Sequence, residues 1–248
     1  MRTLAALLPI ALLALPAPMP APPPTGETLL RQMHDRYAGK WYRTLTFVQT
    51  SQFADGRTET WYEAAEIPGK LRIDVAPLDS MNAIIFRSDS LYVFRGGKLR
   101  VGRPEVHPLM VLGFDVYATP VAETIRKLRD RKIDLAKVRE ATWQGRPAWV
   151  VGAAEGDTTS AQFWIDRERL VFVRLMEMGE GPSGPAREET QFNKYRPLGG
   201  GWIAPECLFY IDGKLFLTET YADIRADPPL PPSTFAVDSF RTPAWVAR

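Results

Sequence analysis

The chain has 248 residues, 45% of them hydrophobic, and its 12 Phe, 8 Tyr and 7 Trp supply enough apolar surface for a large core. This composition excludes disorder for most of the length. The 31 basic and 29 acidic residues give a net charge of +2, so charge indicates neither a nucleic-acid-binding nor an acidic surface. No shift in composition marks a boundary, and we expect a single domain over residues 25–248.

The first 24 residues have the pattern of an export signal. Met1 and Arg2 give a positive start, residues 4–15 are apolar, and a Pro/Ala-rich stretch follows. An apolar run of this length is too short to span a bilayer but is typical of a signal peptide. We therefore predict a signal peptide and Pro-rich leader over residues 1–24, and a soluble mature protein in the periplasm.

One helix is expected directly after the leader, over residues 27–38. Thr25 is suited to cap its start and Gly39 to end it. The apolar residues of this segment recur at helical spacing, at Leu29, Leu30, Met33 and Tyr37.

From residue 45 to about residue 221, apolar and polar residues alternate in short runs separated by turn signals such as Gly56 and Gly69. This period of two indicates antiparallel strands with one apolar face. We expect about eleven strands, with residues 202–210 as one of them. Because a sheet of this width does not stay flat, the predicted fold is mainly β (α+β), a curled antiparallel sheet that forms a half-open barrel.

Residues 105–130 interrupt the strands with an apolar segment at 109–114, followed by a helix that opens at Thr119-Pro120. With the first helix, this insert is expected to cover the concave face of the sheet. The apolar segment has two interpretations, a buried plug or a mobile lid over a ligand cavity. The basic residues between Arg126 and Lys132 are either a solvated helix end or a contact for anionic lipid headgroups.

Catalytic and metal-binding patterns are weak throughout. His34 and His107 are the only histidines, Cys207 is the only cysteine, and no closely spaced ligand set exists. Glu63 and Asp74 alternate with apolar residues, which indicates solvated strand faces rather than a pair of catalytic acids. We therefore expect no enzymatic activity, no cofactor and no metal. The alternative, an extracytoplasmic hydrolase, requires one of these carboxylates or histidines.

Short motifs in a fixed order carry a resemblance to a known family. They are Phe47-Val-Gln49, Lys70-Leu-Arg72-Ile, Phe163-Trp-Ile-Asp166, Val171-Phe-Val-Arg174, Gly201-Trp202-Ile-Ala-Pro205, Tyr221-Ala-Asp-Ile224 and Pro232-Ser-Thr-Phe235. Together they resemble the LolA/LolB-like periplasmic lipoprotein carriers and outer-membrane lipoprotein-sorting proteins, over residues 27–240.

The resemblance implies a half-open β-barrel whose apolar cavity holds acyl chains and performs no chemistry. On this basis the strand residues expected to form the cavity floor are Phe47, Trp61, Ile73, Phe163 and Ile165. The residues expected to form the lid are Leu109, Met110, Phe114, Val121 and Ile125.

The expected function is a monomeric periplasmic carrier of lipoprotein or lipid acyl chains, with a membrane-bound donor or acceptor protein as a further partner and no nucleic acid. The alternative is a periplasmic lipid-sensing regulatory module that binds a membrane-anchored partner. Both use the same apolar cavity, and a likeness in fold does not separate them.

Overall fold

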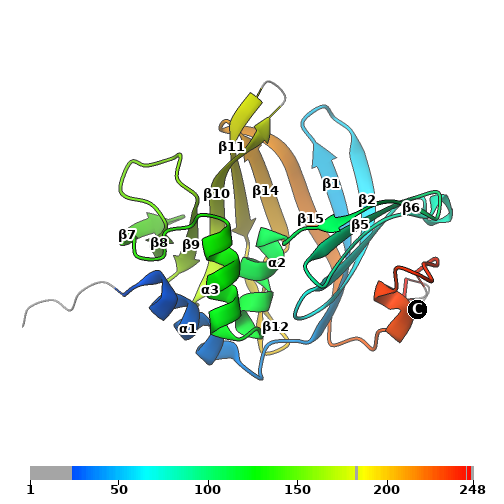
Figure 1. The fold of residues 1–248 in the computed structure, drawn as a ribbon, viewed down its shortest axis with the longest axis horizontal. Helices are drawn as coiled ribbons and strands as arrows, with labels where there is room; N and C mark the ends of the chain where they lie inside the picture. Colours follow the sequence, from blue (N-terminus) through cyan, green and yellow to red (C-terminus); the bar gives the residue numbers. More distant parts are fainter. Residues whose placement is uncertain (1–23, 182–183, 244, 247–248) are drawn as a thin grey trace, which may run out of the picture.

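Thirteen antiparallel strands form one continuous sheet that curls without closing (Figure 1). The computed structural model describes residues 24–181, 184–243 and 245–246, so the predicted leader, apart from residue 24, lies outside the described residues. The strands, in sheet order, are β6 (Lys98–Pro104), β5 (Ser90–Arg95), β4 (Asn82–Arg87), β3 (Lys70–Val75), β2 (Thr58–Glu66), β1 (Thr44–Phe53), β15 (Lys214–Ala226), β14 (Glu206–Ile211), β11 (Gly184–Asn193), β10 (Val171–Gly181), β9 (Gln162–Asp166), β8 (Arg146–Val151) and β7 (Val138–Trp143).

The topology explains how a single chain builds this sheet. Strands β1 to β6 follow one another as hairpins, and pairing of β1 with β15 joins them to the second half. The two free edges are β6 and β7, which are consecutive strands in the chain. The segment between them therefore has to cross from one edge of the sheet to the other, and it does so as helices over the concave face (Figure 1).

Helices are present in both predicted segments, and the insert is divided into three short helical pieces. The first is α1 (Gly26–Tyr37), and the Thr25 hydroxyl accepts a hydrogen bond from the Thr28 N–H at 3.2 Å as its cap. The insert holds α2 (Pro108–Gly113), a single 3₁₀ turn η2 (Asp115–Tyr117) and α3 (Val121–Asp130). Pro120 separates the last two, because its ring disfavours helical geometry in the residue before it.

Two strand predictions need correction. The large sheet has thirteen strands, where about eleven were expected. Residues 202–210 do not form one strand, because the chain breaks at Ala204-Pro205, where proline lacks the N–H that a ladder needs. The residues before the break, β13 (Gly201–Ile203), pair with β12 (Arg196–Leu198) in a separate two-stranded sheet, and β14 begins after it.

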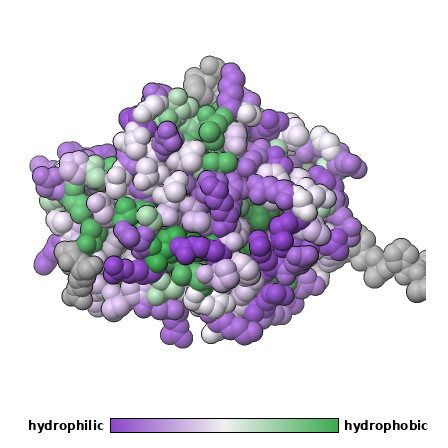
Figure 2. All heavy atoms as spheres, turned by 180° about the vertical axis from the view of Figure 1, so that it is seen from behind, coloured by the Kyte–Doolittle hydropathy of each residue, from purple (hydrophilic) through white to green (hydrophobic). Residues whose placement is uncertain are grey.

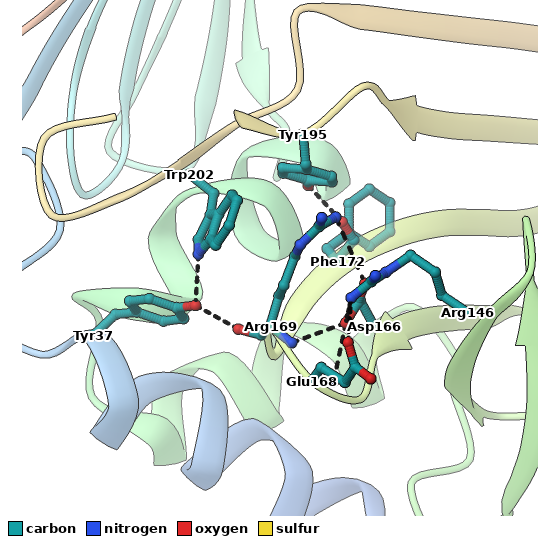
Figure 3. Close-up of polar contacts among 8 residues, drawn as sticks. All are labelled: Tyr37, Arg146, Asp166, Glu168, Arg169, Phe172, Tyr195 and Trp202. Carbon is teal, nitrogen blue, oxygen red and sulfur yellow. Dashed lines mark hydrogen bonds and ion pairs between the residues drawn. The ribbon is translucent and has the colours of Figure 1, made fainter. Parts of the chain in front are cut away.

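The end of α1 is fixed to the turn between β9 and β10 (Figure 3). The Tyr37 hydroxyl donates to the Arg169 carbonyl oxygen and accepts from Trp202 Nε1 at 3.0 Å. The turn itself is held by Asp166, whose carboxylate accepts two backbone N–H bonds at 2.8 and 3.0 Å and a bond from Arg146 Nε at 2.6 Å. Charge-assisted bonds of this kind are among the stronger ones in proteins, so the helix docks on a rigid support.

The Pro-rich C-terminal segment covers the outer face of β3, β4 and β5. Arg72 and Asp74 are both buried there, and Arg72 donates to the Asp74 carboxylate at 2.7 and 2.8 Å. Arg72 also donates to the Thr234 carbonyl at 2.9 Å, in the 3₁₀ turn η3 (Pro232–Phe235). Phe240 stacks on Phe94 with ring centroids 4.0 Å apart. Asp74 is therefore not on a solvated face, since the end of the chain covers it.

The face of the molecule seen from behind is mostly hydrophilic (Figure 2). Seen from behind, hydrophobic residues gather only in separate patches among polar ones (Figure 2). The most exposed large apolar side chains of the described residues are Leu99, Val101, Met178, Leu215 and Phe216. The main apolar faces of the strands are thus turned inward, toward the helices.

Replacing Arg72 by Ala should lower the free energy of unfolding by about 3–5 kcal/mol, because the Asp74 carboxylate then stays buried without its partner. Chemical denaturation measures this value. Arg100→Ala on the exposed strand β6 is the matched control, and it should stay within about 0.5 kcal/mol of the unmodified protein. Equal losses in the two variants would mean that the buried ion pair does not hold the C-terminal segment.

Candidate functional site

A cavity of about 150 Å³ lies between α2 and the concave face of the sheet. Its sheet side comes mainly from β1, β2, β3 and β15, and its helical side from α2 and the residues around it. The apolar lining residues are Leu45, Phe47, Trp61, Ala65, Ile67, Leu71, Ile73, Leu109, Met110, Phe114, Phe192, Phe209 and Tyr221. The polar lining residues are Gln49, Glu63, Lys70, His107, Asp115 and Glu219.

The pairing register explains why these strand residues meet. Phe47 lies opposite Glu63 on β2, and Glu63 lies opposite Ile73 on β3. Gln49 lies opposite both Trp61 and Tyr221 on its two neighbouring strands. Directly opposed residues share a face and every second residue returns to it, so the period of two in the sequence places one row from each strand in the cavity.

Six of the ten residues expected at a ligand site line this cavity. On the strands they are Phe47, Trp61 and Ile73, and on the helical side they are Leu109, Met110 and Phe114. Whether these residues bind a ligand is taken up below as a proposal.

The other four residues lie elsewhere. Phe163 and Ile165 on β9 are fully buried in the main core, and Val121 and Ile125 on α3 pack against that core without lining the cavity. The reason is that helices fill this half of the concave face, where α3 contacts α1 and the Tyr117 hydroxyl accepts the backbone N–H of Phe172 at 3.3 Å. The cavity described above lies in the half of the concave face near β1 to β3.

The segment that covers the cavity is attached at its C-terminal end. Asp115 accepts a hydrogen bond from the Gly69 N–H, in the turn between β2 and β3, at 2.9 Å. Burial raises the pKa of this carboxyl to about 6, although the Gly69 bond lowers it. At Gly113 the backbone lies so close to Phe192 that a Cβ atom would come within 2.8 Å of its ring. The bond from Gly69 to Asp115 and apolar contacts therefore help to hold α2 over the cavity.

The basic residues near the end of α3 are largely paired with acidic side chains. Lys127 is buried and reaches Asp89 at 2.7 Å and Glu123 at 3.1 Å. Arg129 pairs with Glu27, Arg131 with Glu177 and Arg126 with Asp130. These pairs favour a structural role for the cluster over contact with lipid headgroups.

Two acidic residues of the cavity wall are the part of the site that the sequence did not predict. Glu63 is 5% exposed and Glu219 is 8% exposed, on β2 and β15. The Tyr221 hydroxyl donates to Glu219 at 3.1 Å and lies 3.3 Å from Cys207 Sγ. Glu63 is thus on the inner face, which corrects the expectation of a solvated position. Its alternation with apolar residues could have indicated either face.

Burial is the main cause of the shifted pKa values of Glu219, Glu63 and His107. It raises the pKa of Glu219 to about 7, and the bonds from Tyr221 and Gln49 only partly offset this. It also raises the pKa of Glu63 well above the usual value, with a further contribution from the charge of Glu219. Burial and the charge of Arg131 lower the pKa of His107 to about 4, so this residue is neutral at pH 7.

Within the described ranges, no three His, Cys, Asp or Glu side chains are grouped so that they could hold a metal ion. No helix in that part of the chain is long and apolar enough to cross a membrane.

Several solved structures share this architecture. A LolA superfamily protein from Nitrosomonas europaea matches with a TM-score of 0.52 and 10% identity, covering 88% of this chain and 100% of the other. A putative outer membrane lipoprotein-sorting protein domain from Vibrio parahaemolyticus matches with a TM-score of 0.54 and 13% identity, covering 85% and 96%. The chain has the LolA-like fold.

This LolA-like fold is also found in a DUF1329 family protein from Desulfovibrio piger, with a TM-score of 0.54, 13% identity and coverage of 87% and 98%. No protein-family model matches the sequence, and no curated protein matches it either. The fold implied by the short motifs is therefore confirmed by structures whose sequences differ at most positions.

In the unmodified protein, Glu219 should make the free energy of unfolding fall between pH 6 and pH 8. Replacing Glu219 by Gln should remove this fall. The folded-state pKa of about 7 lies above the unfolded value of about 4.3, so the protonated carboxyl stabilises the fold at low pH. This contribution is lost as pH rises through 7, and over this window it amounts to about 1 kcal/mol. Denaturant titrations at pH 6, 7 and 8 measure it.

The pKa values of Asp115 and His107 also differ between the folded and unfolded states, but both groups are present in the two proteins and their contributions cancel in the comparison. The charge of Glu219 contributes to the raised pKa of Glu63, so Glu219→Gln also weakens the pH dependence that comes from Glu63. The control is Glu140→Gln on the exposed side of β7, which should keep the pH dependence of the unmodified protein. If Glu219→Gln shows the same pH dependence of stability as the unmodified protein, the Glu219 carboxyl is already ionised throughout pH 6 to 8.

Proposed function

We propose that this protein is a periplasmic carrier that holds acyl chains of lipids or lipoproteins in the cavity under α2, without catalysing a reaction. The observation that carries the proposal is a mainly apolar cavity between a curled sheet and a short apolar helix. The LolA-like fold supports it, as does the similarity to a structure described as an outer membrane lipoprotein-sorting protein domain. The export pattern of residues 1–24 supports a periplasmic location.

The size of the cavity sets a condition on this function. A cavity of about 150 Å³ accommodates a group of about the size of benzene, which is much less than a full acyl chain. A carrier of such chains therefore has to move α2 away from the sheet when cargo enters. Each methylene transferred from water into the cavity contributes about 0.8 kcal/mol, so a chain of ordinary length provides enough free energy to displace this helix.

Phe114→Asp should weaken binding of a neutral fluorescent acyl ester by about 10- to 100-fold, because the ring lines the cavity and its burial contributes about 1.5–3 kcal/mol. Fluorescence titration measures the Kd. Phe216→Asp is the matched control, since Phe216 is 45% exposed and lies outside the cavity, and its Kd should be unchanged.

Thermal unfolding of both variants checks that Phe114→Asp is folded, and Phe114→Ala repeats the test without a charge. Native mass spectrometry of protein from a periplasmic extract, followed by solvent extraction, identifies any lipid that copurifies. If the unmodified protein binds neither the ester nor a natural lipid, the proposed function is wrong.

Asp115→Ala should speed release of the same ester by about tenfold. The substitution removes the bond to the Gly69 N–H that holds the covering segment, and a loss of about 1.4 kcal/mol corresponds to a tenfold change. Stopped-flow displacement measures the rate. Asp115→Asn keeps a side-chain oxygen acceptor and should release at nearly the original rate. Equal rates in all three proteins would show that this end of the segment does not limit release.

A further inference from the structure

The acidic side chains of the cavity differ in their hydrogen-bond partners. Asp115 accepts the Gly69 N–H, and Glu219 accepts the Tyr221 hydroxyl. Glu63 lines the same cavity at 5% exposure, and no hydrogen bond or ion pair from another described residue reaches its carboxyl group. The Glu63 carboxyl therefore lies at the cavity with its hydrogen-bonding capacity free for a bound molecule.

The basic groups nearest in the structure do not supply that partner. Lys70 also lines the cavity, but its ammonium group pairs with Glu66. Arg72, on the neighbouring strand, is on the opposite face and pairs with Asp74. His107 is neutral at pH 7, because its pKa is lowered to about 4. The cavity therefore has three carboxyl groups and no cation directed at Glu63 within the part of the chain that the structure describes.

We infer that the cargo is an amphiphile with a primary amine, whose ammonium group pairs with Glu63 while its apolar part lies against Phe47, Phe114 and Ile73. This inference rests on the proposed function, since it assigns the chemical class of ligand for the same cavity. An ammonium group donates the hydrogen bonds that Glu63 lacks, and it balances a negative charge in a place where water is scarce. An anionic headgroup would add a like charge beside Glu63 and Glu219 instead.

Binding should be coupled to release of a proton. In the empty cavity, burial favours the protonated form of Glu63, and it raises the pKa of Glu219 to about 7. An ammonium group in contact with Glu63 favours the ionised carboxylate, so one proton leaves to the solvent as the amine binds. A neutral alcohol of the same chain length does not require this exchange.

The test compares dodecylamine, dodecanol and dodecanoate by isothermal titration calorimetry at pH 7.5. We expect dodecylamine to bind at least tenfold more tightly than dodecanol, and dodecanoate to bind most weakly. Titrations in two buffers with different ionisation enthalpies should report proton release for the amine alone. Glu63→Gln keeps the size of the side chain, and it should remove both the amine preference and the proton release while leaving dodecanol binding unchanged.

Glu140→Gln is the control, because Glu140 is exposed on β7 and lies outside the cavity lining. Equal affinities for the three ligands, or an unchanged amine preference in Glu63→Gln, would overturn this inference and leave the carrier function standing. Failure of all three ligands to bind would overturn the inference and the carrier function together.

Discussion

The pairing of β1 with β15 is the contact on which the rest of this structure depends. It joins two series of hairpins that are otherwise separate, and it is reinforced where Asp227 accepts the Arg43 N–H at 2.7 Å and Thr44 donates to the Pro228 carbonyl at 2.7 Å. It also places Tyr221 against Phe47, with ring centroids 4.3 Å apart. Both cavity glutamates flank β1, so the site does not exist until this pairing has formed. Contacts so distant in sequence form slowly, because a long loop has to close first.

The concave face is divided into two halves with different roles. In one half, α1, η2 and α3 pack against the sheet, and Trp41 stacks on Tyr117 with ring centroids 3.8 Å apart. In the other half only α2 covers the sheet, and a cavity remains. The filled half provides a stable support, and the covered half holds the cavity that the proposed carrier function would open. A carrier needs both, since opening should not unfold the domain.

Local patterns predicted the parts of this structure that depend on local rules. Alternation gave two-faced strands, Thr25 marked the start of α1, and the uncharged run at 109–114 indicated the segment above the cavity. The sequence could not predict which face of the sheet a strand residue occupies, because helices cover one face and the C-terminal segment covers part of the other. Phe163 and Ile165 are apolar and inward, but helices bury them, whereas Glu63 and Asp74 look solvated and are buried on opposite faces. The packing of the C-terminal segment on Arg72 likewise depends on a contact 162 residues away in sequence.

An open sheet leaves backbone N–H and C=O groups free at its margins, and such margins readily recruit strands from other molecules. The margin at β6 is protected against this. All of its residues are exposed, and they include Lys98, Arg100 and Arg103 before the strand ends at Pro104. Two copies aligned through this strand would bring cations together, and proline interrupts the hydrogen-bond ladder. The sheet can therefore stay open at this edge and still resist strand-to-strand aggregation there.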